Sequence, residues 1–349
     1  MITSVSAPEP TPDVRSSDHG AGGHAMCYSA LAWADYHRFT REFGAILSIG
    51  AFVKLFGDRG RGAKLKIPKA MADAFAHPTT DEEREVKAAI DAFSAAQAPL
   101  LEQELFKQKK RLADAERKLA SGKPTKKAAE DQRIALNKIP DLQTKLADLR
   151  RTEPKTRDNR IFPDSYAPVM LMRGGQQVVM PMRYHCRPAG MPASIDRTKD
   201  GKVSGTYNAR RDNLERFWRG QFGYTHAIMV VTAFYENVSK HAMEHRALAP
   251  GEPEQNVVVE FNPNPPQTMI IACLYSHWTA PGEEDLWSFA AITDEPPPEV
   301  AEAGHDRCII QIKPEHVDAW LNPDPANREA LYAILDDRPQ AIYNYRLAA

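Results

Sequence analysis

Strand-length apolar runs follow one another through the second half of this 349-residue chain. They span residues 166–172, 177–182, 227–236, 257–261, 269–275, 287–293 and 309–312. Short runs rich in branched and aromatic residues, bounded by turn-forming residues, predict β-strands. Few helical segments separate them, which argues against a βαβ arrangement. We expect an α+β fold with flanking helices and a mixed or antiparallel sheet that closes on itself like a barrel.

A helical segment interrupts this pattern at residues 79–153. Thr80 and Glu83 have the spacing of a capping box, and Pro99 is expected to break the helix and begin a second one. Apolar residues then recur at helical spacing, at positions 101, 105, 112 and 119 and again at 134, 139, 142, 146 and 149. Residues 121–124 form a turn signal. The pattern predicts a helical hairpin over 99–153, projecting from the main domain or packed on it.

The hairpin is basic, although the whole chain has a net charge of only −1. Residues 100–157 hold 16 Lys and Arg against 9 Asp and Glu. A solvated helical face explains this excess. The alternative is a surface that attracts nucleic-acid phosphates, although it lacks interleaved aromatic residues for base stacking.

The first 26 residues contain many Pro, Gly and Ser residues and few large apolar ones. Such a segment buries too little surface to offset its ordering entropy. We therefore expect a disordered prefix over 1–26, which is removed or reflects a wrongly assigned start, and a single domain over 27–349 that carries the 79–153 insertion.

Four cysteines, Cys27, Cys186, Cys273 and Cys308, are scattered without the spacing of a metal site. We expect reduced thiols in a cytoplasmic protein, with no metal and no cofactor. No stretch of 18 apolar residues is present, so we expect no membrane association. Nothing in the sequence indicates an oligomer, and we expect a monomer.

Cys27 follows Met26 directly, at the point where structure-like patterning begins. If Met26 were the start and were removed, Cys27 would carry a free amine beside its thiol. The amine could form a Schiff base with an aldehyde, and the thiol could then close a five-membered thiazolidine. The alternative is a buried core thiol.

Five segments in order resemble the SOS-response-associated peptidase (SRAP) family, which includes proteins that cross-link to abasic DNA. They are Met26-Cys27, residues 166–168 (Tyr-Ala-Pro), 208–210 (Asn-Ala-Arg), 233–236 (Ala-Phe-Tyr-Glu), and Thr293 followed by residues 305–307 (His-Asp-Arg). The resemblance covers roughly 27–56 and 160–325. It implies an enzyme of DNA damage and the SOS response that traps abasic sites in single-stranded DNA through a thiazolidine at Cys27, shielding the damaged strand.

The resemblance also implies roles for individual residues. Asn208 would hydrogen-bond the sugar, Glu236 would relay protons during Schiff-base formation, and His305 would protonate the leaving oxygen of the sugar. Arg210, Arg211 and Arg183 would line the path of the DNA strand, and Thr293 would contact phosphate or sugar. The alternatives are a turn Asn, a solvated strand-end Glu, a core His, surface ion pairs and a structural Thr.

The sequence departs from the family pattern at its start. Many members read Cys-Gly-Arg, whereas this chain has Cys27-Tyr28-Ser29 and so lacks one Arg. A blocked amine at Cys27 cannot form the Schiff base, so translation must begin at Met26 or the prefix must be cut. Two other functions remain open: a Cys27-dependent hydrolase (a protease that acts on its own prefix or on other proteins), and a non-catalytic module that binds nucleic acid or protein through the hairpin.

Overall fold

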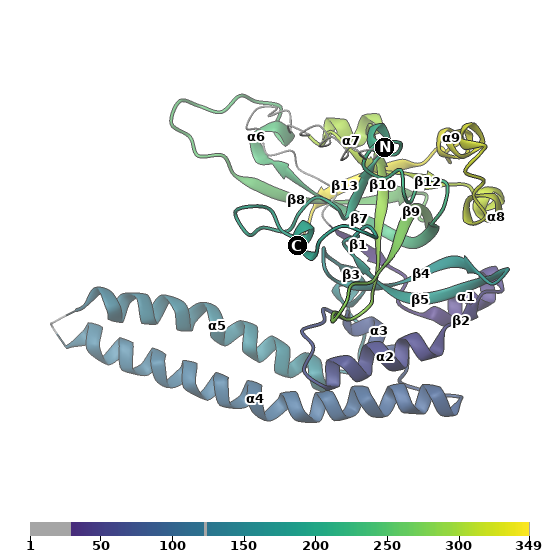
Figure 1. The fold of residues 1–349 in the computed structure, drawn as a ribbon. Coiled ribbons are helices and arrows are strands. Elements are labelled where there is room, and N and C mark those ends of the chain that lie inside the picture. Colours follow the sequence, from purple (N-terminus) through teal and green to yellow (C-terminus); the bar gives the residue numbers. More distant parts are fainter. Residues whose placement is uncertain (1–28, 122–123, 349) are drawn as a thin grey trace, which may run out of the picture.

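The computed structural model describes residues 29–121 and 124–348, and within them nine α-helices surround a 13-stranded sheet (Figure 1). The helices are α1 (Tyr36–Phe43), α2 (Ile49–Gly60), α3 (Lys69–Asp73), α4 (Asp81–Ala120), α5 (Lys126–Arg150), α6 (Lys240–Met243), α7 (Pro298–Glu302), α8 (Val317–Leu321) and α9 (Arg328–Asp336). The strands are β1 (Ser29–Ala32), β2 (Ile46–Leu47), β3 (Arg160–Ile161), β4 (Tyr166–Arg173), β5 (Gln176–Tyr184), β6 (Asn208–Arg210), β7 (His226–Ser239), β8 (Asn256–Asn264), β9 (Met269–Trp278), β10 (Leu286–Asp294), β11 (Cys308–Ile309), β12 (Gln311–Ile312) and β13 (Ile342–Leu347).

The sheet confirms the predicted α+β class. Its main path runs β12-β9-β10-β5-β4-β7-β1-β3, and β7 pairs again with β9, so that the strands form a partial ring. Most pairs are antiparallel, but β10 pairs in parallel with both β5 and β6, which makes the sheet mixed. This parallel pairing brings β6 beside β10, although some 75 residues separate them in the sequence.

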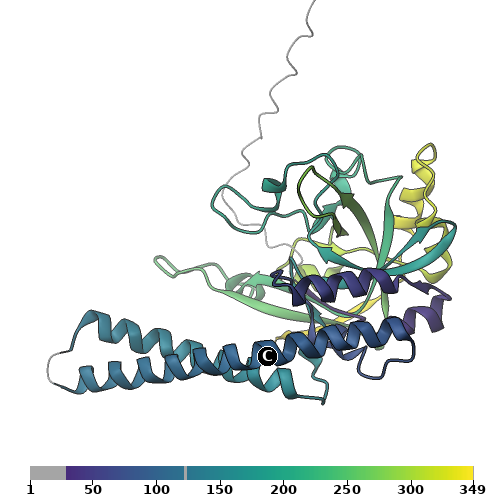
Figure 2. The same ribbon diagram turned by 60° about the horizontal axis from the view of Figure 1, so that its bottom comes forward.

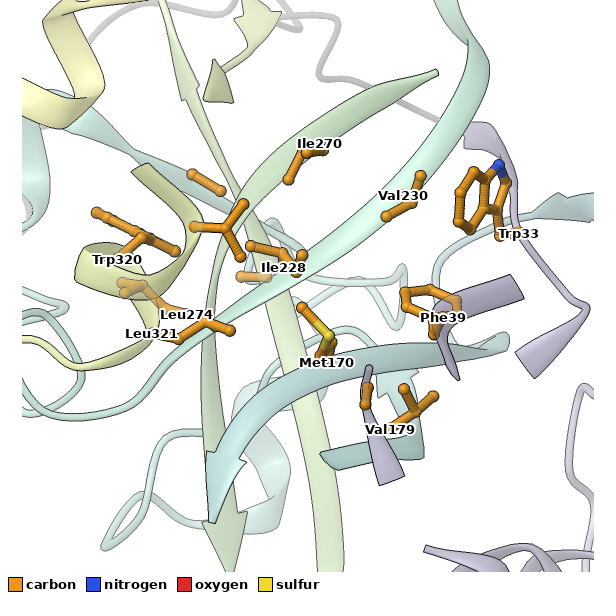
Figure 3. Close-up of a cluster of buried hydrophobic side chains, with 14 of the residues drawn as sticks. Trp33, Phe39, Met170, Val179, Ile228, Val230, Ile270, Leu274, Trp320 and Leu321 are labelled. Carbon is orange, nitrogen blue, oxygen red and sulfur yellow. The ribbon is translucent and has the colours of Figure 1, made fainter. Parts of the chain in front are cut away.

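Both faces of the central strand β7 are buried. Ile228 and Val230 point into one hydrophobic cluster, whereas Met229 and Val231 point into another, because successive side chains of a strand alternate between faces. Figure 3 shows the first cluster, where Ile228 lies near Met170 of β4 and Trp320 of α8. β7 is therefore held in place from both sides.

Helix α4 begins as the sequence predicts but does not break at Pro99. The Thr80 hydroxyl accepts a hydrogen bond from Glu83 N at 3.2 Å, while the Glu83 carboxylate accepts one from Thr79 N at 2.6 Å instead of from Thr80 N. The helix then runs through Pro99 to Ala120. Pro99 is solvent-exposed, so water can satisfy the carbonyl that its missing N–H leaves unbonded. Helix α4 therefore starts at residue 81, and no second helix begins at Pro99.

The two long helices α4 and α5 form the predicted hairpin, which projects from the sheet in both views (Figures 1 and 2). Small residues lie fully buried between them, namely Ala115, Ala128 and Ala135. An ion pair between Arg111 and Asp131, 2.9 Å apart, joins the helices across their interface. Residues 122–123 of the expected turn lie outside the described part of the chain.

Two local features near the site were not predicted. Residues 29–32 form strand β1. The strand expected to end at Glu236 continues to Ser239, because β8 pairs with it over this whole stretch. Glu236 is therefore an interior strand residue and is 0% exposed.

Candidate active site

A buried acid–base pair lies where β7 meets the loop that follows α7. Nε2 of His305 is 3.3 Å from Oε2 of Glu236, and neither side chain has solvent exposure. Glu236 is placed by its register opposite Val259 of β8. His305 is placed by the strand β11, which starts three residues later and pairs with the end of β10. The fold thus joins two residues that lie 69 positions apart.

The hydrogen bonds of His305 define how a proton can be held between the pair. Its Nδ1 lies 2.7 Å from the carbonyl oxygen of Arg307, so a proton on Nδ1 satisfies that contact. Nε2 then carries no proton in the neutral ring. A proton between Nε2 and Glu236 must be an additional one, which either residue can hold. Such a pair is suited to taking up and releasing one proton.

Asn208 is the first residue of β6, and its side chain is positioned by a tyrosine. The hydroxyl of Tyr184 donates to Oδ1 of Asn208 at 3.2 Å, and both residues are buried. In the parallel register with β10, Asn208 lies opposite Ala291 and Arg210 opposite Thr293. Because Oδ1 accepts this hydrogen bond, the orientation of the Asn208 amide is fixed, and its NH₂ group is the hydrogen-bond donor.

The chain segment that follows Cys27 is paired directly with the strand that carries Glu236. Ser29 of β1 lies opposite Tyr235 of β7. Arg160 of β3 supports this corner, because its Nε donates to the Ser29 hydroxyl at 3.0 Å and its guanidinium lies 3.7 Å from the centroid of the Tyr235 ring. Cys27 itself, like the whole 1–26 prefix, lies outside the described residues.

The other three cysteines are buried free thiols. Burial raises the pKa of Cys186 to about 12 and raises the pKa of both Cys273 and Cys308 further still. Because the thiolate is the nucleophilic form, these three thiols are unreactive near neutral pH.

Each predicted DNA-binding arginine has an acidic partner. Arg183 is 2.8 Å from Asp196, and its side chain is only 13% exposed. Arg211 contacts Asp336 at 2.6 Å. Arg210 pairs with Asp212 at 2.7 Å but keeps 43% of its side chain exposed. Arg210 is thus the most accessible of the three to a phosphate.

The predicted contact residue Thr293 is buried, with 1% exposure, near the end of β10. Its neighbours across the sheet are Arg210 on one side and Ile309 on the other. The described residues contain no group of three or more His, Cys, Asp or Glu side chains placed to hold a metal ion. No helix in the described ranges has the length and apolar character needed to cross a membrane.

The sequence profile of the family described as SOS response associated peptidase (SRAP) matches residues 124–348. This chain belongs to the SRAP family. The match covers well over half of the chain and includes Asn208, Glu236 and His305. It begins within the hairpin, so Cys27 and β1 precede it.

Three solved structures are similar to this SRAP chain at low identity. A protein of Bordetella bronchiseptica is 14% identical, with a TM-score of 0.43, over 55% of this chain and 87% of that one. A protein of Bacteroides thetaiotaomicron is 13% identical (TM-score 0.39; 54% and 77% covered). A phage-related protein of Bordetella bronchiseptica is 16% identical (TM-score 0.39; 54% and 80% covered). No curated protein matches this chain in sequence.

The structure of this SRAP chain adds neighbours that sequence reasoning missed. Tyr184 orients Asn208, the Arg307 carbonyl orients His305, and Arg160 supports the start of β1. The backbone contact from Arg307 carries no sequence signal at all. The tyrosine and the arginine stand in segments whose residue types are typical of an ordinary strand, so only the fold reveals them.

Proposed function

We propose that this chain covalently traps abasic sites in single-stranded DNA through a thiazolidine formed by Cys27. The family supports a function in the response to DNA damage. The chemistry of the thiols supports the choice of residue. Because burial raises the pKa of Cys186, Cys273 and Cys308, Cys27 is the candidate nucleophile among the four cysteines.

The observation that carries this proposal is the buried Glu236–His305 pair. Glu236 lies on β7, and the residue before it, Tyr235, pairs with Ser29, two positions after Cys27. An acid–base pair excluded from water can move protons to a reacting group nearby without competition from solvent.

The proposed reaction joins one aldehyde to one cysteine with loss of one water. The free amine of Cys27 attacks C1′ of the ring-opened sugar, and the resulting carbinolamine loses water to give a Schiff base. The thiol then adds to the imine carbon, and the nitrogen takes a proton. Glu236 accepts and returns the amine and thiol protons, His305 protonates the sugar oxygen as the ring opens, and the Asn208 amide hydrogen-bonds the sugar.

The test is the intact mass of two purified proteins, one full-length and one beginning at Cys27. Each is mixed with a single-stranded oligonucleotide that contains one abasic site, and with an undamaged oligonucleotide of the same sequence. We expect the Cys27-start protein to gain the mass of the damaged oligonucleotide less one water. Cys27→Ser should abolish the adduct, and Cys273→Ala, a matched change at a buried thiol, should keep it. An adduct that persists in Cys27→Ser refutes the proposal.

A peptidase activity is the second candidate, because the family takes its name from one. In this role the Glu236–His305 pair would activate Cys27 for cleavage of the prefix. Purified full-length protein would then release residues 1–26 on incubation, and Glu236→Gln would prevent the release. A stable full-length chain that never loses its prefix excludes self-cleavage.

A further inference from the structure

A second cluster of reactive groups lies beside the candidate site and uses none of its residues. Nδ1 of His185 is 2.7 Å from Oδ1 of Asp164, and Nε2 of His185 is 3.0 Å from the hydroxyl oxygen of Ser204. The imidazole is fully buried, while Ser204 is only half-buried. A serine, a histidine and an aspartate in this order of contact form the arrangement that activates a serine hydroxyl.

The ionisation of Asp164 determines which atoms of the trio donate and which accept protons. Burial raises the pKa of Asp164, but hydrogen bonds from His185 and Arg197 outweigh that effect and hold its pKa below the ordinary value. Asp164 is thus an ionised acceptor, so Nδ1 of His185 carries the proton that the two share. Nε2 is then the free base that accepts the hydroxyl proton of Ser204.

The backbone is strained at two of the three residues. His185 has a φ of 149° and Asp164 a φ of 73°. Of the described residues other than glycine, only His245 shares a positive φ with them. Such conformations are unfavourable for residues other than glycine and gather at functional sites, where they aim a side chain. A histidine that served only to fill the core would gain nothing from this strain.

A cavity of about 470 Å³ is lined by residues that adjoin the trio, although by none of the three members themselves. Its lining includes the immediate chain neighbours of two members, Ser165 after Asp164 and Val203 before Ser204. The lining is completed by Phe162, Pro163, Tyr207, Lys66 and Lys202. The Lys66 ammonium lies 3.6 Å from Asp164, and the Lys202 ammonium pairs with Asp200 at 2.8 Å. The cavity combines apolar walls with two lysines. Because the Lys202 side chain is 81% exposed, its ion pair with Asp200 is weak, and a small anionic molecule can compete for the ammonium group.

We propose that Ser204 is a second nucleophile of this protein, activated by His185 and Asp164, that takes the acyl group of small anionic carboxylic esters. This inference is independent of the cross-linking function, which uses other residues. Oγ of Ser204 attacks the ester carbonyl as its proton passes to Nε2 of His185. The alcohol then leaves with that proton, and water, deprotonated by His185, hydrolyses the acyl-serine.

The experiment is covalent labelling of the full-length protein with an alkyl fluorophosphonate, read by intact mass and peptide mapping. The Ser204 oxygen forms a bond to phosphorus, and fluoride leaves. We expect one label at Ser204, lost in Ser204→Ala and retained in Ser194→Ala, which changes an exposed serine ten residues away. His185→Gln should slow labelling about 100-fold, because it removes the general base.

Asp164→Asn provides a second test in case His185→Gln does not fold. Asparagine tolerates the positive φ at this position, so the backbone is preserved while the acceptor charge is lost. We expect this variant to fold with a lower melting temperature, because Arg197 and His185 lose their charged partner, and to label more slowly than the parent. The proposal is overturned if Ser204 stays unlabelled in the folded parent protein. It is also overturned if Ser204 is labelled as fast in His185→Gln and Asp164→Asn as in the parent.

The charge of the substrate is tested with two esters, p-nitrophenyl acetate and the mono-p-nitrophenyl ester of succinate. We expect faster release of p-nitrophenol from the succinate ester, and loss of that preference in the double variant Lys66→Met, Lys202→Met. Equal rates for the two esters in the parent protein overturn the assignment of an anionic substrate.

Discussion

Glu236 and His305 contact each other at 3.3 Å inside the protein, with no solvent exposure of either side chain. The contact joins a strand in the middle of the sheet to a loop that follows a short helix. Because the carbonyl of Arg307 already accepts a hydrogen bond from the other ring nitrogen of His305, the pair has a place for one further proton.

Replacing the carboxyl group of Glu236 by an amide should slow cross-linking far more than it affects folding. Glu236→Gln keeps the shape of the side chain but cannot accept a proton, and we expect adduct formation to slow about 100-fold or more. The matched control is Glu260→Gln, a nearby carboxylate on β8 that pairs with Arg346 at 3.1 Å. Rates come from gel-shift time courses with an abasic oligonucleotide. Equal rates in the two variants would remove Glu236 from the mechanism.

Stability should fall as the pH drops below about 6.5, because of His226. Burial lowers the pKa of His226 to about 3. The neutral ring is held between the N–H of Gly223, which donates to Nε2 at 2.8 Å, and the carbonyl of Trp320, 3.1 Å from Nδ1. The unfolded chain, with a histidine pKa near 6.5, binds a proton that the folded chain excludes.

The sign of the effect follows from that difference. Between about pH 6.5 and 3 the unfolded state gains the proton, so the free energy of unfolding decreases by about 1.4 kcal/mol for each unit of pH. We expect a loss of about 2 kcal/mol between pH 6.5 and 5 in urea titrations. His226→Gln should remove most of this slope, and an unchanged slope in that variant would mean that other groups cause it.

Arg210 and Arg183 should respond differently to substitution, although both were predicted to bind DNA. Arg210→Ala should weaken binding to single-stranded DNA and reduce the slope of log K against log salt by about 0.7, the value for one phosphate contact. Arg183→Ala should instead lower the free energy of unfolding by about 2 kcal/mol, because it removes a buried bond to Asp196. Binding titrations at several salt concentrations, with thermal melts alongside, distinguish the two. A reversed pattern would make Arg183, and not Arg210, the residue that contacts the DNA.

The hairpin should be dispensable for cross-linking if the cut is made in the right place. Val86 and Ile90 of α4 are buried in the core, so deleting the whole predicted insertion would unfold the protein. Glu102 and Arg150 lie 2.7 Å apart at the base of the projecting part. Replacing residues 103–149 by a short Gly-Ser linker should preserve the melting temperature and the adduct yield on short oligonucleotides. A folded variant that no longer forms the adduct would assign the hairpin an essential role.

The strands were predictable because their apolar runs are distinct and their turns are marked. The path of α4 through Pro99 was not, because the cost of a proline depends on whether water reaches the unbonded carbonyl. Nor could local patterns show that Glu236 meets His305, since 69 residues separate them and only the register of β7 with β8 and of β10 with β11 joins them. The acidic partners of the arginines were hidden for the same reason.

The cluster of Asp164, His185 and Ser204 could not be predicted from the sequence either. No local pattern marks Asp164, His185 or Ser204, since each stands in a segment of ordinary composition. Two of them become conspicuous only through backbone angles that the rest of the described chain, His245 apart, leaves to glycine.

Because helix α4 is uninterrupted, the hairpin is a stiff extension of the core and not a flexible attachment. Its first turns are clamped among core side chains, with Val86 fully buried, and α2 lies alongside it (Figure 2). Forty helical residues extend about 60 Å. A force applied near the far end would therefore be transmitted to Val86. The packing of the core around the first turns of α4 sets the direction in which the hairpin points.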